Sequence, residues 1–381
     1  MADTPKLSLC VITKNEEANL PGCIESVRGV VDEIVVTDSG STDRTVALAR
    51  RAGATVSSIV WRDDFSFAYN DCISHAKSEW VLLLDADERL DTDSIPILRR
   101  LIKRTDAFAY TVLRRDYFGS TLEDGSYAEM LQTRLFRRRD GLRFVGRIHQ
   151  QLEPSLSACA AVEHRQVLPS EIRIDHLGYL GDQQQAKLAR SIRMLELELA
   201  ERPGSFYYLV ELGRSKLAAG DATGVDALAE AAAMVETGAG PAGQSSPMVQ
   251  VLIEQLLAAD VLPDAFPMTL EKAEEIAETE YTDSIPVCWQ LARKRFKSGR
   301  FEDAVRLLES IRSMASSGRY NKACSFAPTR IYTEAALNLG VCYAHVGRVD
   351  DAIAAFESIL EDPTHGAAAA ANAATLRSLN T

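Results

Sequence analysis

The stretch Trp80–Leu90, WVLLLDADERL, decides the fold of the first half of this chain. Its apolar residues run without interruption into Asp85 and Asp87, which stand one residue apart, and Glu88 follows directly. A continuous apolar run of this length is typical of a strand buried on both faces of a parallel sheet. The stretch therefore predicts a buried strand that ends in a cluster of carboxylates.

Strand-like and helix-like segments alternate on either side of this stretch. Strands are predicted at 7–13, 33–38, 54–61 and 80–85, with helices between them at 15–29, 41–53 and 65–78. This alternation indicates an α/β domain whose mostly parallel, Rossmann-like sheet is covered by helices on both faces. No Gly-x-Gly-x-x-Gly follows the first strand and no GxxxxGK[ST] occurs, which argues against a dinucleotide-binding dehydrogenase and a P-loop NTPase.

The pattern changes after residue 106. Further strands are predicted at 107–119 and 171–181, and a hairpin at 131–146 around Asp140-Gly141. From about Gln183 onward the sequence predicts helix to its end, so we divide the chain into two domains, 1–182 and 183–381.

The predicted helical domain contains a repeat. ELGRSKLAAGD (211–221), QLARKRFKSGR (290–300) and NLGVCYAHVGR (338–348) share a Leu-small pair followed by a glycine seven residues after the small residue. The pattern resembles the tetratricopeptide repeat, a helix-turn-helix unit in which small residues permit close packing. The copies begin 79 and 48 residues apart, so insertions are expected between them, for example at 238–247.

Composition limits the classes of partner. The net charge of −12 argues against general nucleic-acid binding, which needs a basic surface. Seven cysteines without CxxC pairing indicate reduced thiols. With neither a signal peptide nor an apolar run of roughly 18 residues, the sequence predicts a cytoplasmic protein, either free or peripheral to a membrane.

Polar residues follow three of the predicted strands at the point where each strand ends. They are Thr13, Asn15 and Glu16 after the first strand, Asp38 after the second, and Asp85 and Asp87 after the fourth. Ligands of open parallel sheets bind at the carboxyl ends of the strands. An isolated Asp-x-Asp is more often a turn or helix cap, but its position here favours a site for Mg²⁺ or Mn²⁺, which prefer oxygen ligands.

Three segments carry a resemblance to a known family: VITKNEEANLPGCIESV, DEIVVTDSGSTDRT and SEWVLLLDADE. In order and spacing they resemble the family 2 glycosyltransferases of the GT-A fold, which transfer a sugar from a nucleoside diphosphate with inversion. The resemblance implies that Asp38 binds the nucleotide base, that Thr13, Asn15 and Glu16 line the nucleoside pocket, and that Asn70 faces the nucleotide sugar. It also implies that Asp85 faces the ribose and diphosphate and that Asp87 holds the divalent metal.

The resemblance extends more loosely beyond residue 90. FVGRIHQQLEP resembles a Gly-x-Ile-His-Glu segment of a subgroup that carries tetratricopeptide repeats, which implies that His149 contacts the metal or diphosphate, although Gln150 replaces the acid. His176, in IDHLGY, occupies a second histidine position, but a lone histidine is more often structural. Glu129 lies where an acceptor-side base is expected, with a solvated strand edge as the alternative.

The arginine-rich segment from Arg134 to Arg147 has two interpretations. The simpler one is a solvated face, and the other is that Arg134 or Arg147 supports the diphosphate.

The sequence thus favours a metal-dependent glycosyltransferase that uses Mn²⁺ or Mg²⁺ and a nucleoside diphosphate sugar, with UDP the commonest choice in the family. The helical repeats would position a peptide, glycan or lipid-linked acceptor, or form a homodimer. The alternative is a repeat-based protein-interaction scaffold with an inactive enzyme-like domain. A sugar nucleotidylyltransferase is disfavoured because the loop after the first strand, TKNEEAN, is acidic rather than basic and rich in glycine.

Overall fold

The structure, a computed structural model, describes residues 6–119, 127–180, 184–241, 246–322, 324, 326 and 328–379. The chain divides into two compact units, which we describe separately. The first comprises Met1–Gly125 and Met130–Pro203, and the second comprises Ser126–Glu129 and Gly204–Thr381. The boundary expected at 182/183 falls outside the described residues, and the units divide about 20 residues later, at Pro203/Gly204.

The first unit is built on a mixed, mostly parallel sheet. Its strands, in the described part of the chain, lie in the order β3-β2-β1-β4-β7-β6-β8-β5. Their bounds are β1 Leu7–Thr13, β2 Glu33–Asp38, β3 Thr55–Ser58, β4 Trp80–Leu83, β5 Glu88–Leu90, β6 Ala107–Gly119, β7 Tyr127–Arg137 and β8 Gln166–Leu180. β1 runs parallel to β2 and β4, and β6 to β8, whereas β7 is antiparallel to β4 and β5 is antiparallel to β8.

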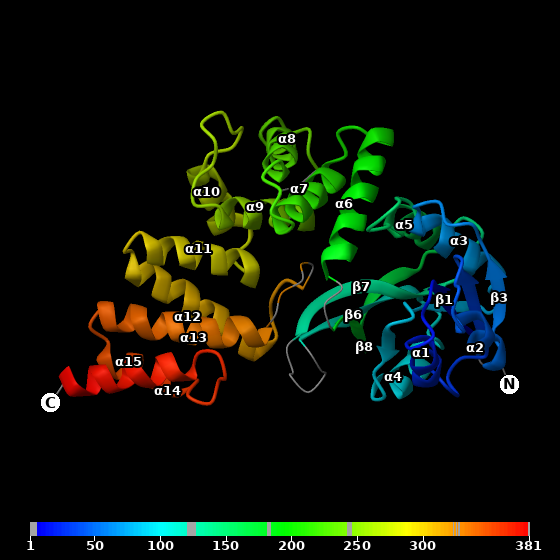
Figure 1. The fold of residues 1–381 in the computed structure, drawn as a ribbon, viewed down its shortest axis with the longest axis horizontal. Coiled ribbons are helices and arrows are strands. Elements are labelled where there is room, and N and C mark those ends of the chain that lie inside the picture. The colour runs from blue at the N-terminus through cyan, green and yellow to red at the C-terminus, as the bar shows by residue number, and fades with distance from the viewer. Residues whose placement is uncertain are drawn as a thin grey trace. The chain divides into compact units, whose positions relative to one another are not determined.

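Helices cover both faces of this sheet (Figure 1). One layer consists of α1 (Leu20–Ser26), α2 (Thr45–Arg51) and α4 (Ser94–Leu101), and the other of α3 (Phe65–His75) and α5 (Glu153–Val162). Along β1, Leu9 and Val11 pack against the first layer, while Cys10 between them packs against the second. Alternate residues of a strand point to opposite faces, so a strand that is apolar throughout must be covered twice. The predicted α/β fold is confirmed.

Strand register brings the predicted site residues to one edge of the sheet. Thr13 pairs with Asp38 at the ends of β1 and β2, and the N–H of Leu84 donates to Cys10 O at 3.2 Å. Asp85 therefore leaves the sheet beside the end of β1. The short strand β5 then turns back along β8, where Glu88 lies opposite His176.

Two details of the sequence prediction for this region are wrong. No hairpin forms around Asp140-Gly141: β7 ends at Arg137, and the chain then runs irregularly to α5, which the pattern did not reveal. Nor is the arginine-rich segment a solvated face throughout, since Arg134 and Arg137 are only 6% and 3% exposed. Their guanidinium groups bond to buried acids and to backbone carbonyls, which compensates for their loss of water.

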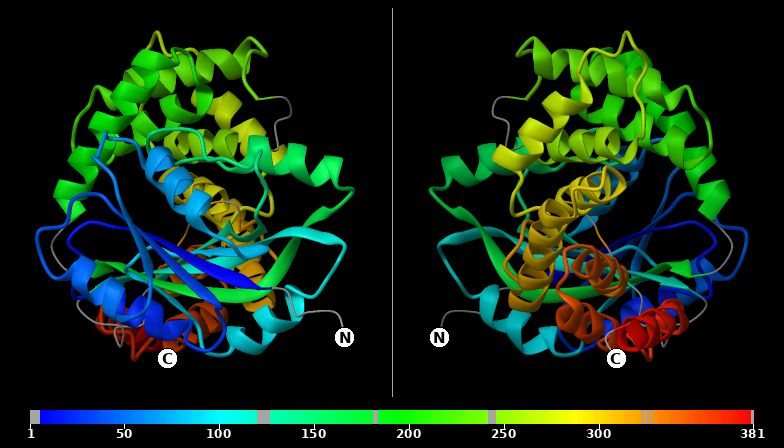
Figure 2. Two further views of the ribbon diagram at one scale, coloured as in Figure 1. Left: turned by 90° about the vertical axis from the view of Figure 1, so that its right-hand side faces the viewer. Right: turned by 90° about the vertical axis from the view of Figure 1, so that its left-hand side faces the viewer.

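The second unit is helical. After α6 (Gln184–Glu201), which belongs to the first unit, its helices are α7 Phe206–Ala218, α8 Gly224–Glu236, α9 Pro247–Ala258, α10 Leu270–Glu280, α11 Ile285–Lys297, α12 Phe301–Ser317, α13 Pro328–His345, α14 Val349–Glu357 and α15 Gly366–Leu379. Figure 2 shows these helices in colours that run from green to red along the chain. Within the described residues, no helix is both long enough and apolar enough to cross a membrane.

Each sequence repeat corresponds to the first helix of a helix pair, namely α7 with α8, α11 with α12 and α13 with α14. The small residue is needed where the two helices touch. A Cβ on Gly213 would lie 2.6 Å from the side chain of Leu228, and one on Gly340 would lie 2.5 Å from Phe356. Real Cβ atoms do not come this close to other atoms. The small residue of the repeat is therefore required by the packing of the two helices against each other.

A partly buried carboxyl in this unit predicts a pH-dependent stability. Burial raises the pKa of Glu254 on α9 to about 7, although Arg214 opposes the shift. Because the folded pKa exceeds the unfolded one, this group stabilises the fold fully below about pH 4.5, and the contribution is lost as pH rises through 7. We expect Glu254→Gln to be more stable than the wild type at pH 8 by up to about 3 kcal/mol, and to lose that advantage at pH 4.5.

Urea unfolding at the two pH values measures this difference. Glu236→Gln, at an exposed position of α8, is the matched control and should change stability little at either pH. An equal effect of Glu254→Gln at both pH values would contradict the prediction.

Candidate active site

The loops after β1 and β2 form one side of the site and are bonded to each other. Asp38 is 3% exposed, and its carboxylate accepts the backbone N–H groups of Gly40 at 3.0 Å and Ser41 at 2.9 Å. The hydroxyl of Thr13 donates to its other oxygen at 3.3 Å. A carboxylate offers about four acceptor positions, so Asp38 shapes its loop and keeps capacity for one more donor.

Asn15 closes the same side. Its backbone has a φ of 56°, which asparagine tolerates better than most residues, and its side-chain oxygen accepts the N–H of Thr42 at 2.8 Å. The next residue, Glu16, lies within electrostatic range of the acids that follow β4. Burial raises the pKa of Glu16, and Asp87 and Asp85 raise it further. The structure thus brings Glu16 and the Asp-x-Asp pair into one electrostatic environment.

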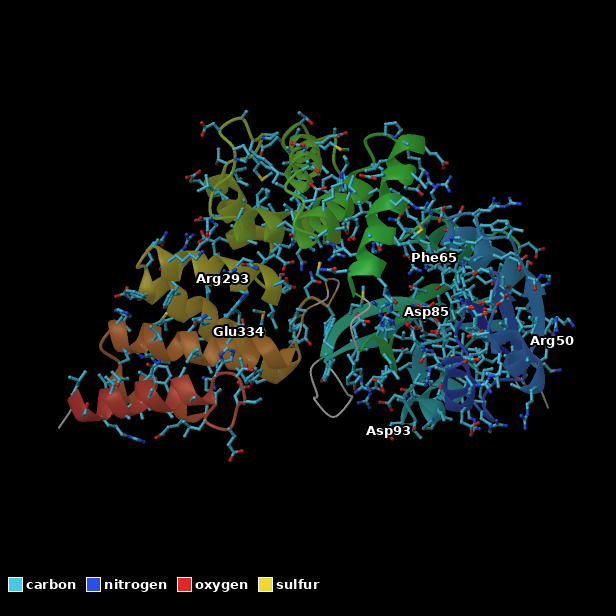
Figure 3. The ribbon with its side chains drawn as sticks, in the orientation of Figure 1. Arg50, Phe65, Asp85, Asp93, Arg293 and Glu334 are labelled. Carbon is cyan, nitrogen blue, oxygen red and sulfur yellow. The ribbon has the colours of Figure 1, made fainter. Side chains whose placement is uncertain are left out.

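Asp85 is directed inward. One carboxylate oxygen accepts the hydroxyl of Tyr69, and the other lies 3.2 Å from Nη2 of Arg134. Although burial raises the pKa of Asp85, Arg134 and Tyr69 together hold it below its ordinary value. Figure 3 shows Asp85 among the densely packed side chains of the first unit. Asp85 is therefore ionised, and the guanidinium of Arg134 compensates its charge.

Glu88 forms the floor of the site and has no exposed surface. One oxygen lies 2.9 Å from Arg134 and 3.9 Å from Arg114, and the other accepts the N–H of Asp85 at 2.9 Å. Desolvation raises the pKa of Glu88, and Arg134 opposes that rise. Arg134 is thus shared between the buried Glu88 and the partly buried Asp85, a role that the sequence did not indicate.

Asp87 faces a histidine supplied by β8. The Nε2 atom of His176 lies 3.5 Å from Oδ2 of Asp87, and its Nδ1 atom lies 2.6 Å from Asp116. Burial alone would lower the pKa of His176, but its bonds to Asp116 and Asp87 raise it to about 9. A histidine whose second nitrogen is held by a carboxylate has a fixed ring orientation, as metal-binding histidines usually have.

A glycine leaves space between these two groups. A Cβ on Gly178 would lie 2.1 Å from Oδ2 of Asp87 and 2.6 Å from Nε2 of His176. Oδ2 and Nε2 thus converge on a place that only a residue without a side chain leaves open. Asp87 and His176 fit a divalent cation that would complete its coordination with phosphate oxygens and water. No group of three or more potential metal ligands occurs among the described residues.

The amide of Asn70 makes its hydrogen bonds within the protein. Both atoms of the Asn70 amide bond to the backbone of Phe144, at 2.8 and 2.9 Å, so Asn70 holds a loop in place. His176 lies beside Asp87. His149 has a backbone φ of 48°, and its contact with the metal or diphosphate stays a prediction. Pairing of β5 with β8 joins residues 89 positions apart, which spacing along the sequence cannot reveal.

Glu129 was expected to be an acceptor-side base. It belongs instead to the second unit, where its carboxylate accepts the hydroxyl of Tyr320 at 2.9 Å and lies 3.7 Å from Lys322. Its N–H donates to Phe326 O at 2.9 Å. These bonds give Glu129 a structural role, and we do not assign it as a base.

The space at Gly178 makes a specific prediction. Gly178→Ala should destabilise the first unit by about 1–3 kcal/mol, as overpacking does, and should weaken Mn²⁺ binding at least tenfold because Asp87 and His176 must separate. Gly141→Ala is the control, since its Cβ would meet only Cys159 Sγ at 3.4 Å. Calorimetric titration with Mn²⁺ and urea unfolding test both effects, and unchanged Mn²⁺ affinity in Gly178→Ala would refute the site.

Comparisons with known proteins agree with this architecture. Residues 8–166 match the model of the family described as glycosyl transferase family 2. Among curated proteins, a TPR repeat-containing protein of Synechococcus elongatus is 37% identical over 221 residues, 57% of this chain and 53% of that protein. The prophage-derived glycosyltransferase SunS of Bacillus subtilis is 26% identical over 225 residues, 56% of this chain and 50% of its own. The chain thus spans about half the length of these curated relatives.

Among solved structures, Staphylococcus aureus TarS 1–349 in complex with UDP is 15% identical, covers 77% of this chain and 92% of its own, and gives a TM-score of 0.39. The family match begins in β1 and ends at the first residue of β8, so it takes in the loops and acids described above. Residues 8–166 thus match the family 2 glycosyl transferases, and a helical region whose helix pairs carry the repeat described above follows this match in the chain.

Proposed function

We propose that this protein is a metal-dependent glycosyltransferase that transfers a sugar from a nucleoside diphosphate to an acceptor with inversion. The observation that carries the proposal is the convergence of Asp87 and His176 on the space above Gly178. It lies at the carboxyl edge of the sheet, where α/β proteins bind their ligands, within a family 2 domain.

Asp87 and His176 would hold Mn²⁺ or Mg²⁺. A bound divalent cation stabilises the negative charge that develops on a departing diphosphate. Around it the chain supplies fixed groups: Arg134 keeps Asp85 ionised and in place, and Asp116 orients the imidazole of His176. Such preorganisation avoids rearrangement during the reaction.

The nucleoside would occupy the side formed by the loops after β1 and β2. There Asp38 retains acceptor capacity for a base or ribose donor, and Thr13, Asn15 and Glu16 form the wall. UDP is our first choice of nucleotide because it is the commonest in the family that the sequence resembles.

The helical unit suits an acceptor or partner. Stacked helix pairs form extended surfaces, which supports a peptide, a glycan or a lipid-linked sugar as acceptor, or a second copy of the chain. A scaffold with an inactive enzyme-like domain is the competing function, and the acids and histidine kept at the site disfavour it.

A thermal-shift screen tests the proposal. UDP, GDP, dTDP and CDP are each added with and without Mn²⁺ to the wild type, to Asp87→Ala and to Asp93→Ala, whose acid is exposed and lies at the margin of the unit in Figure 3. A ligand at about 100 times its Kd stabilises by roughly 2.7 kcal/mol, which should raise Tm by about 5 °C or more. We expect one of these nucleotides to raise the Tm of the wild type and of Asp93→Ala, and to do so only in the presence of Mn²⁺. No rise with any nucleotide would favour the scaffold.

A further inference from the structure

Helix α6 brings a lysine into the site that neither the sequence pattern nor the family match assigns, since the match ends at residue 166. The ammonium nitrogen of Lys187 donates to the carbonyl of Gly178 at 2.5 Å and lies 4.0 Å from Oδ2 of Asp87. It therefore lies at the rim of the space on which Asp87 and His176 converge. Its charge also reaches Glu16, whose pKa it lowers against the raising effect of burial.

Two arginines of this site are committed to acids behind it. The guanidinium of Arg134 lies between Asp85 and Glu88, and that of Arg114 lies against Asp116 at 2.9 Å. Their side chains are 7% and 12% exposed. Moving either toward a ligand would leave a buried carboxylate without its counter-charge, at a cost of several kcal/mol.

Lys187 differs from these arginines in two respects. Its side chain is 34% exposed, and it donates to a neutral carbonyl, that of Gly178. At 4.0 Å from Asp87 it is an outer partner of that acid. Lysine is also a point charge on a flexible four-carbon stem, so it can follow a ligand without disturbing the fold.

We propose that Lys187 binds the diphosphate of the nucleotide sugar and neutralises the charge on the departing nucleoside diphosphate. This inference rests on the proposed function. A cation held by Asp87 and His176 would repel the ammonium from Asp87, and the phosphate oxygens beside that cation would offer Lys187 an anionic partner at the same rim. Lys187 would then exchange the carboxylate of Asp87 for the ligand.

The experiment compares Lys187→Gln with Lys187→Arg and with Arg190→Ala. Glutamine keeps a donor for the carbonyl of Gly178 and removes the charge, whereas arginine keeps the charge. Arg190→Ala removes an equal charge from the exposed side of the same helix, so it controls for the general field of α6. The affinities of each variant for UDP and for uridine are measured by calorimetric or NMR titration in the presence of Mn²⁺. If the thermal-shift screen selects another base, the diphosphate and the nucleoside of that base are used instead.

We expect Lys187→Gln to bind UDP about 10–100-fold more weakly, the loss usual for a charge-assisted hydrogen bond, and to bind uridine like the wild type. Lys187→Arg should retain most of the affinity and Arg190→Ala nearly all of it. Equal UDP affinity in Lys187→Gln and the wild type would overturn the inference alone, and an equal loss for uridine and UDP would show a merely structural role. Failure of the wild type to bind any nucleoside diphosphate would overturn the proposed function itself.

Discussion

Arg134→Ala is expected to destabilise the first unit by about 3–5 kcal/mol, because removing one partner of a buried ion pair leaves the other charge without compensation. Glu88 has no exposed surface, and Arg134 lies 2.9 Å from it. Asp85 would lose the same partner, so two acids would have to take up protons or water for the unit to stay folded. Urea unfolding at pH 7, followed by circular dichroism, measures the loss.

Two further variants make this test specific. Arg143→Ala removes an exposed arginine from the same arginine-rich segment and should change stability by less than about 0.5 kcal/mol. The double variant Arg134→Met with Glu88→Leu removes both buried charges and should be more stable than Arg134→Ala. If Arg134→Ala unfolds like the wild type, Arg134 is not the counter-charge of this site.

Asp87→Ala is expected to reduce sugar transfer by about 10²–10³-fold while the protein stays folded, since a bound metal stabilises the leaving charge by several kcal/mol. The carboxylate of Asp87 is partly accessible and makes no hydrogen bond to a buried arginine in the described structure, unlike that of Asp85. Its removal should therefore affect the ligand more than the fold. The measurement is the rate of donor hydrolysis or transfer over a range of Mn²⁺ concentrations.

The dependence of the rate on Mn²⁺ in two variants shows whether Asp87 binds the metal. Asp87→Ala should abolish the dependence of the rate on Mn²⁺, whereas Asp93→Ala should preserve both the rate and that dependence. An Asp87→Ala enzyme that keeps its rate and its response to Mn²⁺ would exclude Asp87 as the metal ligand.

The arginine-rich segment shows why sequence patterns fail for buried charge. Arg134, Arg137 and Arg143 look equivalent in the sequence, and a run of arginines is most often exposed. In the structure two of them are buried and Arg143 is exposed, because β7 enters the middle of the sheet and then ends. The difference depends on strands from other parts of the chain, which no local pattern contains.

Asn70 and Glu129 show the same limit for candidate ligands. A polar side chain at a matching position is free for a ligand only if nothing in the protein binds it first. The amide of Asn70 is taken by the backbone of Phe144, 74 residues away, and the carboxylate of Glu129 by Tyr320, 191 residues away. Both partners are brought there by the tertiary fold.

The sequence by itself determined the α/β order of the first 90 residues, the acids at the strand ends and the helix pairs of the second half. These follow from local periodicity: a strand buried on both faces must be apolar throughout, and a helix pair that packs closely must have a small residue at the contact. Only the tertiary structure decided that His176 lies beside Asp87, that Gly178 keeps the space between them open, and that Lys187 reaches its rim. The reason is physical. Pairing of β5 with β8 and packing of α6 join residues about 90–100 positions apart, and such contacts are selected by the packing of the whole unit rather than by the residues near them in the chain.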